Sequence, residues 1–333
     1  MRIAIFGLGA VGGHLGARLA ASGHDVCVIA RGPTLDAIRR NGLELRSGEQ
    51  IIKVEVRASD RPADFDEPDM VIVTVKATEP QALAAGLASI MRRGTAVVFA
   101  QNGVPWWYEL GRTKSKQPLP DLEFLDPGRA LQELIPADQV IGAVIHSSNE
   151  MVEPGVVYNA SPESNTLLVG EVDNRASARI AELRQFLESA GIKSPEVSDI
   201  RQAIWRKLMI NMSASVICLL TGQKASVIRD DRRIGALYLA LAREAIAVAR
   251  AHGIDTRGFD PEAFRANAPD HLPSIRQDYE RGRALEIDSM LVAPQAFARA
   301  AGVDTPHFDT VVTLAVRMAA DRGLYQPAEV AES

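Results

Sequence analysis

The residues Arg2-Ile3-Ala4-Ile5-Phe6-Gly7-Leu8-Gly9-Ala10-Val11-Gly12 decide the fold of the N-terminal part of this chain. The apolar run at 2–6 is typical of a buried strand, and the Ala-rich stretch through about residue 22 is typical of a helix. Gly7 permits a tight turn, Gly9 lets a ligand approach the backbone, and Gly12 lets the helix pack closely on the strand. This order predicts a dinucleotide-binding unit with the pyrophosphate at the helix N-terminus. The alternative is a glycine-rich turn without a ligand.

The end of the next strand indicates which dinucleotide binds. An NAD site usually has an acidic residue there, about 20 residues after the glycines. Here the strand predicted at 25–30 is followed by Arg31, and the next acid is Asp36. A guanidinium suits the 2′-phosphate of NADP, so NADP(H) is the expected cofactor, although a solvated arginine is the alternative. The expected backbone contacts with the cofactor come from Gly7, Leu8, Gly9, Ala10, Val11 and Gly12.

Strand-like and helix-like stretches alternate through the first two-thirds of the chain, which predicts an α/β domain with a doubly wound parallel sheet of the Rossmann type. Further strands are expected at 43–46, 51–57, 70–75, 95–100, 140–145, 156–159 and 166–170, and helices at 34–41, 80–91 and 175–190. Lys76 and Asn102 each follow a predicted core strand, at the sheet edge where such folds bind ligands. Taken singly, each would be an ordinary surface lysine or turn residue.

Near residues 192–199 the sequence pattern changes, and the chain beyond consists of long predicted helices with almost no strand signal. Helices are predicted at 199–220, 232–252, 287–301 and 306–321. We therefore expect two domains, residues 1–195 for the dinucleotide and residues 196–333 for the substrate. Residues 106–139, which include Lys114 and Lys116, read as a long loop with some helix that could act as a lid.

Composition excludes several classes of protein. The chain has 333 residues and a net charge of −5, without the basic excess of nucleic-acid-binding proteins. Cys27 and Cys218 have no metal-ligand spacing and cannot form a disulfide framework. We therefore expect no bound metal, and we expect a reducing, cytoplasmic location. The sequence contains no uninterrupted apolar run of about 18 residues, so no membrane span is expected.

Two polar clusters stand out in the helical part. Lys207, Asn211 and Ser215 are spaced four residues apart on one helix face within an otherwise apolar segment, so they must be hydrogen-bonded or face a wet cleft. A salt bridge between domains is the alternative role for the lysine. Ser274 precedes Gly282-Arg283-Ala284-Leu285-Glu286-Ile287-Asp288, whose acids could simply complement a helix dipole.

The whole chain resembles the ketopantoate reductase family. The resemblance rests on four motifs in order: the GxGxxG at Gly7–Gly12, QNG at Gln101–Gly103, KLxxN at Lys207–Asn211 and GRxxEID at Gly282–Asp288. It implies an NADPH-binding Rossmann domain, an all-α C-terminal domain like that of 6-phosphogluconate dehydrogenase, and an active site in the cleft between them.

The resemblance also implies roles for individual residues. Lys207 looks like the family's catalytic acid, which also binds substrate, and Asn211, Ser215 and Ser274 occupy substrate-binding positions. Asn102 and Ser147 correspond to cofactor contacts, and Glu286 to an acid that contacts the cofactor and helps to close the site. In this chemistry NADPH delivers hydride to C2 of a 2-oxo acid, while Lys207 protonates the oxygen.

Departures from the family pattern leave the substrate open. Ser215 replaces a second asparagine, Leu285 replaces a threonine, and the segment 107–138 is longer than usual. Ketopantoate is the first expectation, another 2-oxo or hydroxy acid the second, and a catalytically silent NADP(H) sensor the third. Trp106 and Trp107 could line the nicotinamide side or simply pack in a loop. Neither nucleic acid nor membrane is an expected partner, and a homodimer is one possible assembly.

Overall fold

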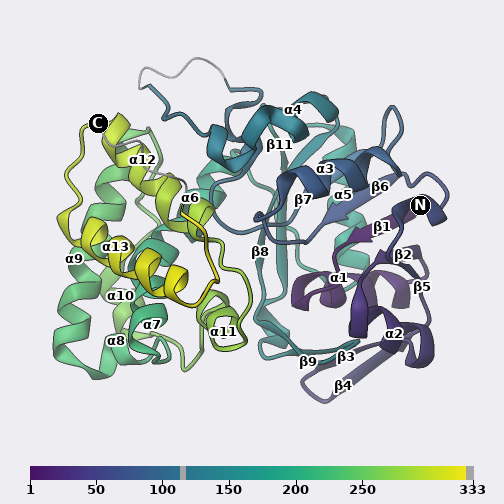
Figure 1. Ribbon diagram of the computed structural model, residues 1–333, viewed down its shortest axis with the longest axis horizontal. Helices are drawn as coiled ribbons and strands as arrows, with labels where there is room; N and C mark the ends of the chain where they lie inside the picture. The colour runs from purple at the N-terminus through teal and green to yellow at the C-terminus, as the bar shows by residue number, and fades with distance from the viewer. Residues whose placement is uncertain (113–117, 328–333) are drawn as a thin grey trace. The chain divides into compact units, whose positions relative to one another are not determined.

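The computed structural model describes residues 1–112 and 118–327 (Figure 1). The chain divides into two compact units, Met1–Thr113 with Asp126–Ala203 and Lys114–Leu125 with Ile204–Ser333. The division falls inside helix α6 (Ile200–Ile210), whereas the sequence pattern places it just before that helix. The pattern also gives no sign that residues 118–125 group with the helical unit.

A seven-stranded sheet forms the centre of the first unit, in the order β11-β8-β7-β6-β1-β2-β5. From β1 the chain adds β2 and β5 on one side and β6, β7 and β8 on the other, all parallel, which confirms the expected parallel-sheet fold. Only β11 pairs antiparallel, with β8. The strands are β1 (Arg2–Phe6), β2 (Asp25–Ile29), β5 (Arg57–Ser59), β6 (Met70–Val73), β7 (Ala96–Phe99), β8 (Val140–His146) and β11 (Thr166–Glu171).

The strands of this sheet are nearly continuous apolar runs because both faces are covered, as parallel sheets require. The helices that lie wholly within the described part of this unit are α1 (Ala10–Ala21), α2 (Gly32–Asn41), α3 (Pro80–Ala88), α4 (Ala130–Leu134) and α5 (Ala178–Ser189). Shorter 3-10 turns are η1 (Pro62–Asp64), η2 (Trp106–Glu109), η4 (Pro127–Arg129) and η5 (Pro162–Ser164).

A second, four-stranded sheet packs against α1. Its order is β4-β3-β10-β9, with β3 (Leu43–Ser47), β4 (Gln50–Val54), β9 (Asn149–Glu153) and β10 (Val156–Asn159). The predicted pairing of 43–46 with 51–57 is confirmed for β3 and β4. The single strand expected at 51–57 is wrong, however, because residues 57–59 pair with β2 in the other sheet. Strand β9 was not predicted, because its polar sequence NEMVE lacks a strand pattern.

Helices make up the described part of the second unit. They are α7 (Val216–Thr221), α8 (Val227–Asp230), α9 (Arg232–Ala251), α10 (Pro261–Ala266), α11 (Ser274–Glu280), α12 (Ala293–Ala300) and α13 (Pro306–Asp321), with the 3-10 turn η3 (Glu123–Leu125). Two π-helical turns, η6 (Asn211–Ser215) and η7 (Asp288–Val292), interrupt the long helices expected at 199–220 and 287–301. The apolar periodicity of the sequence predicts continuous α-helices there and gives no sign of these turns.

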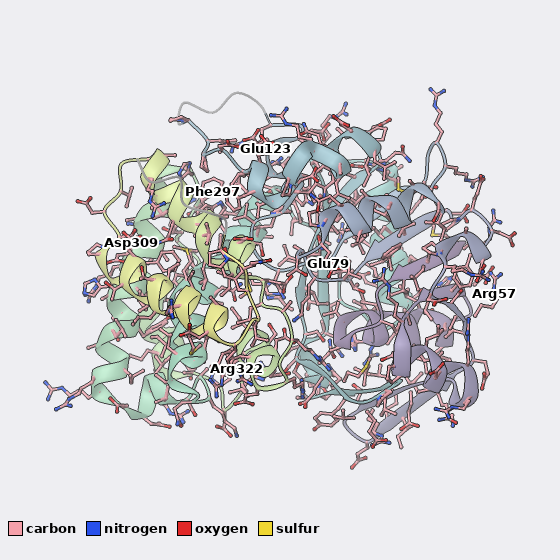
Figure 2. The ribbon with its side chains drawn as sticks, in the orientation of Figure 1. Arg57, Glu79, Glu123, Phe297, Asp309 and Arg322 are labelled. Atoms are coloured by element: carbon pink, nitrogen blue, oxygen red, sulfur yellow. The ribbon has the colours of Figure 1, made fainter. Side chains whose placement is uncertain are left out.

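The long apolar helix at Ile200–Thr221 passes a membrane-span test by length and composition, but 78% of its apolar window is buried inside the protein. It is therefore a core helix. Its Trp205 is fully buried in the second unit and packs edge to face on Phe297, labelled in Figure 2, at a centroid distance of 5.3 Å. The same indole stacks on His252 from the end of α9, so the helix is held by α9 and α12.

Part of the segment expected to be a long loop is firmly packed. Trp107 in η2 is buried against Gly142, where a Cβ would lie 2.5 Å from the indole. Arg201 donates to the carbonyl oxygens of Tyr108 at 2.8 Å and Val172 at 2.6 Å. Trp107 is thus a core residue of the first unit. Lys114 and Lys116 lie outside the described residues, and η3 packs against η7.

Candidate functional site

Steric contacts of the glycine turn between β1 and α1 show what each glycine does. Gly7 has φ +99°, and a Cβ there would lie 2.4 Å from Val75 Cγ1. A Cβ on Gly12 would lie 2.1 Å from the carbonyl oxygen of Gly7. By contrast, a Cβ on Gly9 would meet nothing within 4 Å. The first and third glycines are therefore required by packing, whereas the second faces open space.

The N-terminus of α1 is suited to an anion. Its N-cap is Gly9, which gives no side-chain hydrogen bond, and its first turn has no acidic residue. The backbone N–H groups of that turn therefore remain available, and the helix dipole favours negative charge there. Thr74, which no motif in the sequence indicates, donates from Oγ1 to the Gly7 carbonyl oxygen at 2.5 Å and fixes the turn to the end of β6. These residues fit a dinucleotide diphosphate.

Arg31 follows β2 and forms the N-cap of α2. Its side chain is exposed, and within the described residues it makes no hydrogen bond or ion pair. The sheet winds outwards in both directions from β1, and in such sheets ligands bind at the carboxyl ends of the strands around this switch point. Arg31 stands at that edge next to β1, with its guanidinium available to a phosphate.

Lys76 and Asn102 are brought together at the same sheet edge. Gln101 donates from Nε2 to the carbonyl oxygen of Val75 at 2.9 Å, which joins the segments after β6 and β7. Lys76 and Asn102 are the next residues in each segment, both are half-buried, and both have contacts within the protein. The structure therefore places these two predicted cofactor residues on neighbouring segments at one edge of the sheet of the first unit.

Ser147 follows β8, whose carboxyl end lies at the same edge as that of β7. Its hydroxyl belongs to an asparagine network that the sequence did not reveal. The hydroxyl donates to Asn165 Oδ1 at 2.9 Å and accepts from Asn149 Nδ2 at 2.8 Å and Asn159 Nδ2 at 3.2 Å. Because these bonds saturate the hydroxyl, any ligand contact at Ser147 would fall to its other atoms.

In the second unit, Asn211 and Ser215 are the first and last residues of the π-helical turn η6 and lie next to each other, as their spacing of four residues predicts. Ser215 donates from Oγ to Asn211 Oδ1 at 3.3 Å. Asn211 is 7% exposed, and its Nδ2 has no hydrogen-bond partner within the described part of the chain. A buried amide donor without a partner costs free energy unless a ligand satisfies it. The pair is therefore arranged to present N–H groups to an acceptor such as a carboxylate or keto oxygen.

Lys207 lies one helical turn before Asn211 on α6 and is half-buried. Burial lowers the pKa of Lys207 from 10.5 to about 8, while the negative charge of Glu286 acts in the opposite direction. Glu286 comes just before η7, and η7 packs against η6. The structure thus brings Lys207, Asn211, Ser215 and Glu286 into one cluster, with an ammonium group that can release its proton near neutral pH.

Ser274, Leu285 and Asp288 lie in three different environments. Ser274 is exposed at the first residue of α11, and its hydroxyl makes no hydrogen bond within the described residues, so it is not joined to the Lys207 cluster. Leu285 is buried. Asp288 accepts a 2.5 Å hydrogen bond from Tyr325, a residue that no motif in the sequence indicates.

The described residues contain neither a metal-ligand cluster nor a thiol of lowered pKa. In residues 1–112 and 118–327, no group of three or more His, Cys, Asp or Glu side chains is placed to hold a metal ion. Burial raises the pKa of Cys27 to about 11 and that of Cys218 to about 12, so both thiols stay protonated at neutral pH.

The parallel sheet with its glycine turn, and the helical unit with a lysine of lowered pKa, are the features expected of a dinucleotide-dependent oxidoreductase. Two family models match the chain: Ketopantoate reductase PanE/ApbA at residues 3–120 and Ketopantoate reductase PanE/ApbA C terminal at residues 199–319. The chain belongs to the ketopantoate reductase family, which confirms the resemblance drawn from the four motifs.

Individual relatives agree with this assignment. The 2-dehydropantoate 2-reductase of Mesorhizobium japonicum is 36% identical over 98% of this chain and 100% of its own length. The solved 2-dehydropantoate 2-reductase of Geobacter metallireducens has 28% identity and a TM-score of 0.82, covering 95% of this chain and 99% of that one. D-mandelate dehydrogenase, solved with NADH and anilino(oxo)acetate, has a TM-score of 0.82 over 97% of this chain and 100% of its own. At 19% identity it shows the fold alone.

Proposed function

We propose that this protein is an NADPH-dependent 2-dehydropantoate 2-reductase, which reduces the 2-oxo group of ketopantoate to the hydroxyl group of pantoate, a step towards pantothenate and coenzyme A. The 36% identical relative, a 2-dehydropantoate 2-reductase, supports this choice of substrate. In this proposal residues 1–195 bind the dinucleotide and residues 196–333 carry the acid and the substrate contacts. The observation that carries the proposal is the cluster of Lys207, Asn211 and Glu286.

Lys207 is the proposed catalytic acid. When NADPH is bound, it supplies a hydride for the carbonyl carbon, and the carbonyl oxygen then gains negative charge and needs a proton. A lysine with a pKa of about 8 is protonated at neutral pH and gives up its proton more readily than an ordinary lysine. Its positive charge also stabilises the developing alkoxide before the proton moves from Nζ to oxygen.

Asn211 and Ser215 are the proposed substrate-binding pair. The N–H groups of Asn211 would donate to an oxygen of the 2-oxo acid, since its Oδ1 already accepts from Ser215. Ser274, exposed at the start of α11, is proposed to bind the substrate carboxylate. In this proposal Asn211 supplies donors to one oxygen of the 2-oxo acid, and Ser274 supplies one to its carboxylate.

Most of the proposed cofactor contacts come from the first unit. The backbone of Gly7–Gly12 would hold the diphosphate at the N-terminus of α1, and Arg31 would bind the 2′-phosphate that distinguishes NADPH from NADH. Lys76, Asn102 and Ser147, which follow β6, β7 and β8, are proposed to contact the rest of the cofactor. Glu286 is proposed as a further cofactor contact in addition to its effect on Lys207.

A second candidate is an NADP-dependent reductase of the same family that acts on a different 2-oxo acid. Ser215 is smaller than the asparagine that the family usually has there, and the buried Leu285 offers no hydroxyl to a ligand. Both differences reduce the number of polar contacts available to a substrate. They favour a 2-oxo acid with a bulkier and less polar side chain.

One assay separates these candidates. The purified protein is mixed with NADPH and either ketopantoate or one of a panel of 2-oxo acids, including an aryl-substituted one, and the loss of NADPH absorbance gives kcat/KM for each. The proposed function predicts the highest kcat/KM for ketopantoate. Good turnover of another 2-oxo acid without turnover of ketopantoate would favour the second candidate, and NADPH binding without any turnover would favour a silent sensor.

We propose a cytoplasmic homodimer as the working form. A solved relative, the ketopantoate reductase of Staphylococcus aureus, is described as dimeric. Sedimentation of this chain at several concentrations would distinguish a dimer from a monomer.

A further inference from the structure

The C-terminal segment after α13 contacts the chain on both sides of Glu286. On one side, the backbone N–H of Leu285 donates to the carbonyl oxygen of Leu324 at 2.9 Å. On the other side, the phenolic O–H of Tyr325 donates to Asp288 Oδ1 at 2.5 Å. Two consecutive residues of this segment therefore hold residues 285–288, where the chain turns into η7 at Asp288, at their two ends, with Glu286 between them.

The segment itself is well anchored. The N–H of Leu324 donates to the carbonyl oxygen of Ala319 at 2.9 Å, and the Leu324 side chain is buried. The guanidinium of Arg322, labelled in Figure 2, lies 4.5 Å from the centre of the Tyr279 ring. These contacts fix the segment to α13 and to α11, so it can position what it touches.

Asp288 depends on Tyr325. The carboxyl group of Asp288 is half-buried, burial raises its pKa, and the hydroxyl of Tyr325 is its only hydrogen-bond partner within residues 1–112 and 118–327. Burial and the Asp288 carboxylate raise the pKa of Tyr325, so its O–H remains a donor throughout the working pH range. Removal of this donor would leave a partly buried acceptor without a partner, which favours movement of residues 285–288.

We propose that Tyr325 is a positioning residue of the reductase: together with Leu324 it clamps residues 285–288, so that Glu286 stays next to Lys207. This inference rests on the proposed function, in which Lys207 is the acid. Tyr325 acts through Asp288 and Glu286 rather than by touching the substrate.

The clamp has a measurable consequence for Lys207. The charged group that acts on Lys207 is Glu286, whose negative charge raises the lysine pKa against the effect of burial. If residues 285–288 are released, Glu286 moves away and the pKa of Lys207 falls below about 8. A larger fraction of Lys207 is then neutral at a given pH, and the acid is also less well placed.

The decisive variant is Tyr325→Phe, which removes one hydroxyl group and keeps the ring. We expect kcat to fall about tenfold with a smaller change in KM, because misplacement of catalytic groups mainly affects the chemical step. We also expect the decline of kcat at alkaline pH to begin at lower pH. Tyr158→Phe is the matched control, since Tyr158 is exposed on β10 of the first unit, and it should leave both quantities unchanged.

A second measurement does not require activity. The chain has only seven lysines, so selective carbon-13 labelling of lysine gives few NMR signals, and Lys207→Arg identifies the one from Lys207. Titration of the labelled protein should show a lower Lys207 pKa in Tyr325→Phe than in wild type. Asp288→Asn keeps an acceptor oxygen for Tyr325 and should therefore have a smaller effect than Asp288→Ala.

The outcomes separate the clamp from the proposed function. If wild type turns over no 2-oxo acid, the proposed function fails, whereas the lysine titration still tests the clamp. If wild type is active and Tyr325→Phe has the wild-type kcat and the wild-type Lys207 pKa, the clamp is wrong, whatever happens to thermal stability. A double variant Tyr325→Phe/Asp288→Ala that is no worse than either single variant supports action as a pair.

Discussion

The glycine turn of the first unit and the Lys207 cluster of the second unit are built in opposite ways. The turn works through missing side chains: Gly7 and Gly12 allow close packing and Gly9 leaves open space. The cluster works through side chains that two π-helical turns bring together, with Asn211 on η6 and Glu286 just before η7. A backbone site can be inferred from residue types alone, whereas a side-chain site depends on how helices wind and pack.

The sharpest test of the cluster is Lys207→Ala. Removal of the acid should lower kcat by about a thousandfold, within the range for loss of a general acid, because no proton donor is left at the developing alkoxide. NADPH affinity, measured by fluorescence titration, should stay near that of wild type. Near-normal turnover would disprove the assignment of Lys207 as the acid.

For the turn, the comparison is between Gly12→Ala and Gly9→Ala. The methyl group at residue 12 would collide with the Gly7 carbonyl, so the variant should lose about 2 kcal/mol of unfolding free energy and most of its NADPH affinity. The methyl group at residue 9 has room and should leave unfolding in urea unchanged, while it obstructs the ligand. Equal destabilisation of the two variants would contradict the different roles of these glycines.

Arg31→Ala tests the cofactor preference. Loss of charge-assisted bonds to the 2′-phosphate should lower kcat/KM for NADPH about thirtyfold, while kcat/KM for NADH, which lacks that phosphate, changes little. Arg57→Ala is a suitable control because Arg57 is an exposed arginine paired with Asp25. Parallel losses for both cofactors would exclude Arg31 as the phosphate ligand.

The smallest expected effect is the pH dependence of the wild type. The acid must be protonated to act, and burial places the pKa of Lys207 at about 8 rather than 10.5. The kcat for reduction should therefore be level below that pH and fall as pH rises through it. In Lys207→Arg the guanidinium stays charged, so this decline should disappear from the residual activity. A decline that persists in this variant would belong to another group.

The predictions from local sequence were most accurate where a residue type restricts the backbone for a single physical reason. The strand at 2–6, the glycine turn and the strand at 156–159 occur where their patterns placed them, as does α13 at Pro306–Asp321. In each case apolar periodicity, proline or glycine limits the backbone to a few conformations. The alternation of strands and helices predicted the parallel sheet, whereas the order of its strands came from the structure.

Local sequence patterns did not predict which distant segments pair with each other. Residues 57–59 continue an apparent strand but pair with β2 instead of β3, and β11 runs antiparallel to β8. The asparagine network around Ser147 joins residues from β9, β10 and the loop before β11, none of which carries a pattern for it.

By itself, the sequence determined the parallel α/β domain, the helical second part, the glycine turn and the residue types of an acid cluster, because backbone freedom and apolar periodicity are local properties. The tertiary structure alone decided that Glu286 acts on Lys207 and that Tyr325 holds Asp288. These interactions depend on π-helical turns and on contacts between helices far apart in the chain. Packing, rather than local preference, sets both.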